Sequence, residues 1–453
     1  MNRAIIRPLS TLLMGSTYLL SEFLQTDWIA PLVSLFALTT IMTYMPYLKR
    51  IPFILISALL GSAFLLFIFG DGLWDMFLGL NTNVSVLAIF IFVPLLSIPI
   101  KQGRYLDYLE TVFNHYIQTT GQLYSYVKIA LMGVGSVMNL GTVPIMYQLT
   151  DTPSYQPYRM LRARALGRGF AMAFMWSPYF ISVALILSYF NVSWIQIFPI
   201  GLSMAVVGIT LGILFEKRHS QPIVVESEPS ETTVTIQEAK RKLFELLIII
   251  LCLTAFIMTL EYLVDLSVLT IIPLVAIVLS AIWGLVYERP KDLIKSYGRF
   301  TQERLPAMGN ELSLFIAAGA FGAAILSAGA SEWIIDFINW FGISHILVLI
   351  PVLLIIVTSL SFVGVHPIIT MTALSITLSS SPLFADEHLL LSFGLLANWM
   401  VSVIGSPFSG LNLLMSGLAQ SNPVAVGPRS NLLFALTLWL ICYATICLLY
   451  VVL

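Results

Sequence analysis

The feature that most constrains this chain is a series of about a dozen apolar stretches, each close to the length that crosses a lipid bilayer. Hydrophobic residues make up 58% of the 453 residues and charged residues only 10%, whereas a soluble domain holds roughly 25% charged residues. Most of the chain is therefore expected to use lipid as its solvent. This pattern predicts an all-α polytopic membrane protein and excludes a soluble enzyme.

Eleven of the apolar stretches are expected to form transmembrane helices. They cover residues 1–23, 29–46, 51–69, 84–100, 169–190, 195–215, 243–263, 268–287, 312–330, 388–418 and 432–453. Two further stretches, 127–149 and 345–378, carry glycine and proline near their middle, and each is expected to form a re-entrant helical hairpin. Irregular backbone at that depth must be buried in protein or line a watery cavity, because lipid offers no hydrogen bonds.

The basic residues indicate the orientation of this layout. With the N-terminus in the cytoplasm, all 22 Lys and Arg residues fall on the cytoplasmic side, as the positive-inside rule requires. The expected location is the cell membrane, with membrane lipid as a partner and the C-terminus outside. The net charge of −1 offers no basic field, so nucleic acid is not an expected partner.

The two halves of the chain carry the same sequence devices in the same order. Pro144 in the first hairpin is followed 34 residues later by Pro178, and Pro367 in the second is followed 40 residues later by Pro407. Each later proline follows a serine inside a span and is expected to break it. Because each unit holds five spans, an odd number, the second copy must be inverted. The sequence therefore predicts two opposed hairpins and an inverted-topology repeat with broken fifth and tenth spans.

This repeat divides the chain into four parts. Residues 1–28 hold an extra N-terminal transmembrane helix, 29–215 the first repeat with its cytoplasmic-side hairpin, 216–242 a polar cytoplasmic linker, and 243–453 the second repeat with its outer-side hairpin. An amphipathic stretch precedes each hairpin, at 105–118 and 332–341, and is expected to lie along the membrane interface. A loop or a helix extension is the alternative for the first.

Inverted repeats, interrupted helices and small polar residues near mid-membrane are the combination that secondary transporters use for alternating access. Broken helix ends offer N–H groups to an anion and carbonyl oxygens to a cation. Two clusters are the expected binding sites: Ser136, Asn139, Gly141 and Thr142 at the first tip with Ser177 and Pro178, and Ser359, Ser361, Gly364 and His366 at the second tip with Ser406, Ser409 and Asn412. The alternative is that these residues only allow close helix packing.

Charged groups are not expected at the membrane midplane, which leaves dipoles and hydroxyls as ligands. His366 is a candidate for proton coupling or for donation to an anion, although a neutral hydrogen-bond partner is the commoner role of a buried histidine. Glu311 is a candidate coupling carboxylate, although a polar helix start is favoured. No cofactor or metal centre is expected beyond a coupling Na⁺ or H⁺, with sodium placed at the tips near Asn139 and Ser361.

This layout resembles the ion transporter superfamily, which includes divalent anion:sodium symporters, arsenite permeases and the large membrane subunits of TRAP dicarboxylate transporters. The resemblance covers nearly the whole chain as architecture. The sodium symporters carry a Ser-Asn-Thr signature at each tip. Here Ser136, Asn139 and Thr142 are spaced apart, and the second tip lacks both Asn and Thr. The resemblance implies a homodimer in which a transport domain moves against a scaffold.

The leading prediction is a cation-coupled secondary active transporter of a small, carboxylate-like anion, and not an enzyme. One alternative keeps the fold but changes the cargo to an amphiphilic or lipid-linked substrate, imported or exported. A membrane-embedded enzyme is disfavoured because the outer loops are short and hold no arginine. A channel is the remaining alternative. No nucleotide-binding loop is present, so ATP-driven transport by this chain is not expected.

Overall fold

The fold is given by a computed structural model, which describes residues 3–24, 26, 28–69, 72–218, 220–223, 234–329, 332, 336, 340–343 and 345–452. Throughout this part of the chain the regular structure is helical, and the one β contact is an isolated bridge between Thr119 and Pro222. Ten of the helical stretches are long and apolar enough to cross a membrane. The predicted all-α, polytopic fold is confirmed.

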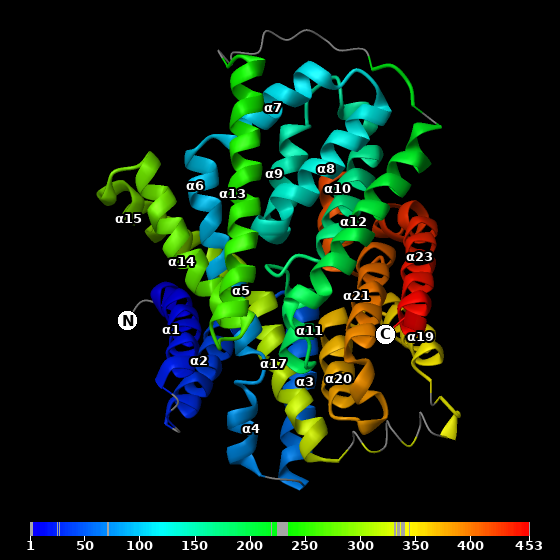
Figure 1. The fold of residues 1–453 in the computed structure, drawn as a ribbon. Coiled ribbons are helices and arrows are strands. Elements are labelled where there is room, and N and C mark those ends of the chain that lie inside the picture. The colour runs from blue at the N-terminus through cyan, green and yellow to red at the C-terminus, as the bar shows by residue number, and fades with distance from the viewer. Residues whose placement is uncertain are drawn as a thin grey trace.

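The first half of the chain runs from α1 to α12 (Figure 1). Its helices are α1 (Arg3–Leu24), α2 (Ile29–Tyr44), α3 (Arg50–Phe69), α4 (Leu73–Gly79), α5 (Val84–Phe92), α6 (Ser97–Gln102), α7 (Tyr105–Tyr116), α8 (Thr120–Met138), α9 (Thr142–Leu149), α10 (Arg159–Ala173), α11 (Ile181–Tyr189) and α12 (Trp194–Lys217). Short 3₁₀ turns lie between several of them: η1 (Met45–Tyr47), η2 (Val93–Leu96), η3 (Asn139–Gly141) and η4 (Gln156–Tyr158).

The second half runs from α13 to α23. Its helices are α13 (Ile236–Leu263), α14 (Val268–Tyr287), α15 (Pro290–Arg299), α16 (Leu305–Ala307), α17 (Gly309–Ser327), α19 (Ile346–Phe362), α20 (Pro367–Ser379), α21 (His388–Gly405), α22 (Gly410–Leu418) and α23 (Ser430–Val452). The π-helical turns η5 (Phe300–Arg304) and η7 (Ala425–Arg429) precede α16 and α23, and the 3₁₀ segment η6 (Pro382–Glu387) precedes α21. In Figure 1, α7 to α9 lie at the top and α3, α4 and α20 toward the bottom.

Two helix pairs form hairpins with tight tips. The helices α8 and α9 are joined through η3, and α19 and α20 through residues 363–366. Each tip contains a residue with positive φ, Asn139 (φ 58°) in the first and Gly364 (φ 99°) in the second. Glycine adopts positive φ freely, so the second tip turns at a residue that suits it. Asn139 combines its positive φ with ψ −155°, a region almost confined to glycine, so the first tip holds a strained residue.

The two prolines predicted to break spans do so. The helix α10 ends at Ala173 and α11 begins at Ile181, with Pro178 between them. Likewise α21 ends at Gly405 and α22 begins at Gly410, with Pro407 between them. A proline lacks the N–H that the helical ladder needs and its ring clashes with the preceding turn, so it disfavours a continuous helix at these positions. The breaks at the fifth and tenth expected spans are therefore confirmed.

The ten candidate spans differ from the eleven predicted spans in both number and boundaries. They include the α8–α9 hairpin as one stretch and omit the broken α10 and α11, neither of which reaches 18 residues. The helix α1 forms as expected but does not meet the same test of hydropathy and charge. The expected fourth span is also divided into α5, η2 and α6.

The linker between the halves is shorter than expected. The Thr235 hydroxyl accepts a hydrogen bond from the Glu238 N–H at 3.3 Å and caps α13, which therefore begins at Ile236 and not at 243. The helix α12 extends through Lys217. Residues 219 and 224–233 of the expected linker lie outside the described residues.

The first amphipathic stretch forms the separate helix α7, and not a loop. Its buried side chains are Tyr105, Leu109, Val112 and Phe113, and it packs against α13. The Tyr105 hydroxyl donates to the Glu245 Oε1 of that helix at 2.6 Å. Most of the second stretch, 332–341, lies outside the described residues.

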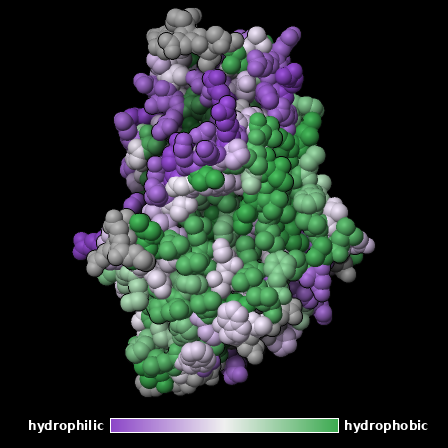
Figure 2. All heavy atoms as spheres, turned by 90° about the vertical axis from the view of Figure 1, so that its left-hand side faces the viewer, coloured by the Kyte–Doolittle hydropathy of each residue, from purple (hydrophilic) through white to green (hydrophobic). Residues whose placement is uncertain are grey.

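The surface separates apolar from polar residues along the long axis of the molecule. Figure 2 shows a face with hydrophobic residues over its middle and lower part and hydrophilic residues gathered at the top. Large exposed apolar side chains on α13 and α14 include Phe244, Leu251 and Ile282. An apolar surface of this extent suits contact with lipid and not with water.

Candidate functional site

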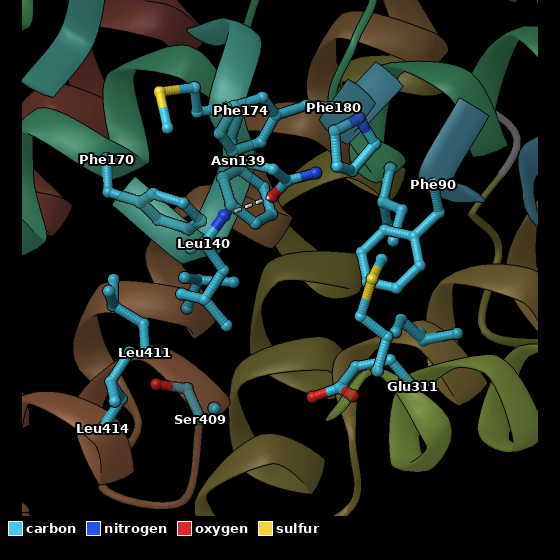
Figure 3. Close-up of a pocket in the computed structure, with 18 of the residues that line it drawn as sticks. Phe90, Asn139, Leu140, Phe170, Phe174, Phe180, Glu311, Ser409, Leu411 and Leu414 are labelled. Carbon is cyan, nitrogen blue, oxygen red and sulfur yellow. Dashed lines mark hydrogen bonds between the residues drawn. The ribbon is translucent and has the colours of Figure 1, made fainter. Parts of the chain in front are cut away.

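A cavity of about 450 Å³ lies where the two hairpin tips meet (Figure 3). It is lined by residues from both halves: Phe90, Pro94, Ser97, Met138, Asn139, Leu140, Gly141, Pro144, Phe170, Phe174, Phe180, Ile181, Phe300, Arg304, Ala307, Met308, Glu311, Phe315, His366, Pro367, Ile368, Trp399, Val403, Ser409, Gly410, Leu411 and Leu414. The first tip, the second tip and both broken spans contribute. This volume is in the range that accepts a small organic molecule.

Seven aromatic rings contribute to the apolar wall of the cavity. The rings are those of Phe90, Phe170, Phe174, Phe180, Phe300, Phe315 and Trp399. Phe170, Phe174 and Phe180 form a triangle with centroid distances of 5.0 to 5.4 Å, and Trp399 lies 6.0 Å from Phe174. Tilted and edge-on contacts of this kind hold the rings in place. The wall is therefore preorganised for an apolar or aromatic group.

The polar side chains of the lining are few. They are Ser97, Asn139, Arg304, Glu311, His366 and Ser409. Arg304 is exposed, and its Nη1 would lie 3.5 Å from a Cβ added to Gly141, so the guanidinium lies beside the first tip. Figure 3 shows Glu311 and Ser409 on opposite sides of the same space. No ion pair within 4.0 Å in the described ranges includes Arg304 or Glu311.

In each half, one buried serine of the broken span is hydrogen-bonded to the hairpin tip. The Ser177 hydroxyl donates to the Ser136 carbonyl at 2.8 Å, and the Ser406 hydroxyl donates to the Ser361 carbonyl at 2.7 Å. Each hydroxyl also accepts the N–H two residues further along, from Tyr179 at 3.3 Å in the first break and from Phe408 at 3.1 Å in the second. These contacts occupy the serine hydroxyls, so their role is to position the tips.

Three further predicted site residues cap backbone at the tips. The Asn139 Oδ1 accepts from the Leu140 N–H at 2.8 Å. The His366 Nδ1 accepts from the Ile368 N–H at 3.3 Å and caps α20, and both residues line the cavity. The Asn412 Nδ2 donates to the Ile404 and Ser406 carbonyls at 3.0 and 2.8 Å, which satisfies the end of α21.

Of the thirteen predicted site residues, four line the cavity: Asn139, Gly141, His366 and Ser409. The other nine lie outside the lining: Ser136, Thr142, Ser177, Pro178, Ser359, Ser361, Gly364, Ser406 and Asn412. Both predicted clusters nevertheless contribute to the same cavity. Several members make capping contacts with backbone groups.

Sequence reasoning missed Arg304 and the aromatic part of the lining. Arg304 was expected on a cytoplasmic loop, and dipoles and hydroxyls were expected to be the ligands, whereas Glu311 was named as a candidate coupling carboxylate with a polar helix start as the favoured alternative. Both charged side chains line the cavity. The π-helical turn η5 places Arg304 at the cavity, and the sequence of η5 does not predict a π-helical turn. The phenylalanines of the lining lie in apolar spans, where the sequence does not distinguish a cavity-lining residue from an ordinary core residue.

A buried basic group joins the halves beside the first hairpin. The Arg168 guanidinium pairs with Glu216 at 3.3 Å and donates to the Asn431 Oδ1 at 2.9 Å. The Lys128 ammonium donates to the Gly208 carbonyl at 2.7 Å and lies 4.6 Å from the centroid of the Phe434 ring. Arg168 and Lys128 therefore connect α8, α10 and α12 with α23.

The fold and the cavity define a polytopic helical membrane protein whose two hairpins meet at a central site. No protein-family model and no curated protein matches the sequence. The fold is similar to that in the crystal structure of the Alcanivorax borkumensis YdaH transporter, which was described as having an unusual topology. The TM-score is 0.59 at 16% identity, over 86% of this chain and 96% of that one. At this identity the likeness concerns the fold alone.

Proposed function

We propose that this protein is a cation-coupled secondary active transporter that moves an organic anion with an apolar body by alternating access. The observation that carries the proposal is the cavity between the two tips, where an aromatic wall faces a guanidinium without an ion-pair partner in the described part of the chain. The likeness of the fold to that of the YdaH transporter supports it.

An inverted repeat of opposed re-entrant hairpins is part of the proposal. Support comes from matched details: the positive-φ residue follows Ser136 by three residues in the first tip and Ser361 by three in the second. Each of these serines accepts a hydrogen bond from the Ser-Pro break of its own half. The same layout underlies the resemblance to the ion transporter superfamily. Such repeats exchange conformations during alternating access.

The charge at the cavity favours an anionic substrate. Arg304 presents a fork of donors that matches a carboxylate. Lys101 lies close enough to Arg304 for the two positive charges to interact, which adds to the positive charge on that side. The aromatic wall favours a substrate with an apolar or aromatic body over a small dicarboxylate. The same wall supports a second candidate cargo, an amphiphile whose apolar chain lies along the rings.

We also propose the location, orientation, oligomeric state and coupling ion of the transporter. We place it in the cell membrane with the N-terminus and the connector between α12 and α13 in the cytoplasm, because the basic residues gather on that side of the layout. A homodimer, with the hairpins moving against a scaffold, follows from the resemblance. The coupling ion is a cation.

Ligand-dependent thermal stability of the purified protein tests the substrate class. A panel of benzoate, phenylacetate, 4-phenylbutyrate, succinate, sulfate and a short-chain phospholipid is screened, since a ligand stabilises the folded state according to its occupancy. Aryl carboxylates are expected to stabilise the wild type most strongly. The Arg304→Gln variant should weaken their binding about tenfold or more, as loss of a charge-assisted hydrogen bond of about 1.5–3 kcal/mol implies.

The matched control is Arg299→Gln, because Arg299 is exposed on α15 and donates only to the Ser296 hydroxyl within its own helix. This variant should bind like the wild type. Stabilisation by the phospholipid alone would favour the amphiphile. Equal binding by both arginine variants would contradict the assignment of Arg304.

A further inference from the structure

We infer that Glu311 carries the coupling proton, so that the transporter moves its anion together with H⁺. This inference rests on the proposed function and names its coupling ion and the residue that binds it. Among the described residues that line the cavity, Glu311 is the single carboxylate. Ionisable groups within a membrane protein are costly unless they serve a function, which makes this position informative.

Glu311 lies in the first turn of α17 and lines the cavity (Figure 3). The carboxylate is turned into the cavity with the Phe90 ring on one side and Ser409 across the space. The residue is half-buried, and no ion pair within 4.0 Å in the described residues engages it. Its protonation is therefore free to change without breaking a salt bridge.

The elements packed against α17 or leading into it carry these charged and titratable groups: Tyr44 of α2, whose ring lies against Gly309, Lys49 and Arg50 at the start of α3, Glu303 and Arg304 of η5, and His366 at the start of α20. The helix α4, which carries Asp75, meets α17 near Ala320 and Ala323. Lys49 interacts with Glu311 electrostatically, and its backbone N–H donates to the Asn310 Oδ1 at 3.1 Å.

A proton suits this site better than a metal cation. Hard cations such as Ca²⁺ and Mg²⁺ take about six to eight oxygen ligands, whereas one carboxylate is enough to bind a proton. The lining offers one carboxylate among aromatic rings, and the Asn139 Oδ1 already accepts from the Leu140 N–H. In the part of the chain that the structure describes, no group of three or more His, Cys, Asp or Glu side chains is placed to hold a metal ion.

The sign of the coupling follows from charge. An ionised Glu311 and a substrate carboxylate would share one cavity of low polarity, where like charges repel strongly. Protonation of Glu311 removes this repulsion and leaves Arg304 to attract the anion. Proton binding and anion binding therefore favour each other, and by linkage the effect is reciprocal. Two ligands that bind together are carried together, which is symport.

His366 is the competing titratable group in the same cavity, and its geometry argues against it. Its Nδ1 accepts the Ile368 N–H, so that nitrogen carries no proton. A doubly protonated imidazole would lose this contact and would place positive charge at the N-terminus of α20, where the helix dipole opposes it. The His366→Asn variant keeps a capping side chain and tests this assignment.

The test measures the affinity of the wild type and of Glu311→Gln for the same aryl carboxylates, from about pH 5.5 to about pH 8.5. Wild-type affinity should fall as the pH rises, by about 5- to 150-fold, the usual range for coupled sites. Glu311→Gln should bind the anion with an affinity that does not change with pH. In proteoliposomes it should exchange anion across the membrane but no longer accumulate it when only a pH gradient is applied.

Three variants keep the result interpretable. Glu303→Gln, which removes an exposed carboxylate of η5 outside the lining, and His366→Asn should both retain the pH dependence. Glu311→Asp retains an ionisable group and should also retain the pH dependence of anion affinity. This variant tests the assignment if Glu311→Gln does not fold. Wild-type binding without pH dependence, or pH dependence retained in Glu311→Gln, overturns the proton assignment alone. Absence of binding by every aryl carboxylate overturns the proposed function as well.

Discussion

At the scale of single residues, the most consequential contacts are the serine hydroxyls at the breaks. Ser406 is buried and its hydroxyl holds the Ser361 carbonyl at 2.7 Å. We expect Ser406→Ala to lower the free energy of unfolding by about 1–3 kcal/mol and to impair transport, because the Ser361 carbonyl loses one of its donors and the Phe408 N–H loses its acceptor. Thermal denaturation and uptake measure the two effects.

The control for this prediction is Ser416→Ala. Ser416 is on the exposed side of α22 and its hydroxyl donates only to the Leu413 carbonyl one turn earlier. Its replacement should leave both stability and uptake near wild-type values. If Ser406→Ala and Ser416→Ala behave alike, the hydroxyl of Ser406 does not position the second tip.

At the scale of elements, the closest contact beside the first break is between α12 and the segment that follows α10. A Cβ added to Gly201 would overlap the Met175 carbonyl oxygen, a backbone atom that cannot move aside cheaply. We expect Gly201→Ala to destabilise the protein by about 1–3 kcal/mol through this overlap. Thermal denaturation of the purified variant measures the loss.

Gly133 provides the matched comparison within a helix. Nothing lies within 4 Å of a Cβ added there, and Gly133 is in the interior of α8. Gly133→Ala should therefore be neutral or stabilise by up to about 1 kcal/mol, because alanine is the better helix former. A loss of stability at Gly133 equal to that at Gly201 would show that the overlap is not the cause.

The sequence predicted elements well where a local physical rule decides them. Proline disfavours a helix interior, and Pro178 and Pro407 lie in the two breaks that the sequence predicted, although Pro199 and Pro273 lie inside continuous helices. The division of the fourth span into α5, η2 and α6 and the early start of α13 depend on prolines and caps within or beside apolar segments. Hydropathy averages over such details, and the element boundaries shifted accordingly.

The site was predicted less completely than the fold. Asn139, Gly141, His366 and Ser409 were found because polar residues and glycines at a hairpin tip stand out in an apolar chain. The aromatic wall was not, because a phenylalanine in a span carries no mark of whether it faces lipid, core or cavity. Glu311 was a candidate because it lies at a polar helix start, whereas Arg304 required the path of the chain from η5 into α17, which only the tertiary structure provides.

At the scale of the whole molecule, the buried basic group holds the two halves together. Arg168 of α10 pairs with Glu216 of α12 and donates to Asn431 and Ser430 of α23. We expect Arg168→Ala to cost about 3–5 kcal/mol, because removal of one partner leaves buried polar groups uncompensated. Arg218→Gln, at the exposed end of α12, should have no such effect on thermal stability.

Uptake of an aryl carboxylate into proteoliposomes tests the central claim most directly. The account predicts that wild-type protein accumulates labelled 4-phenylbutyrate above its external concentration when a cation gradient is applied, with saturable kinetics. Arg304→Gln should lose this accumulation and Arg299→Gln should keep it. A flux that never saturates, or one that never exceeds equilibrium under any cation gradient, would contradict a secondary active transporter and point to a channel.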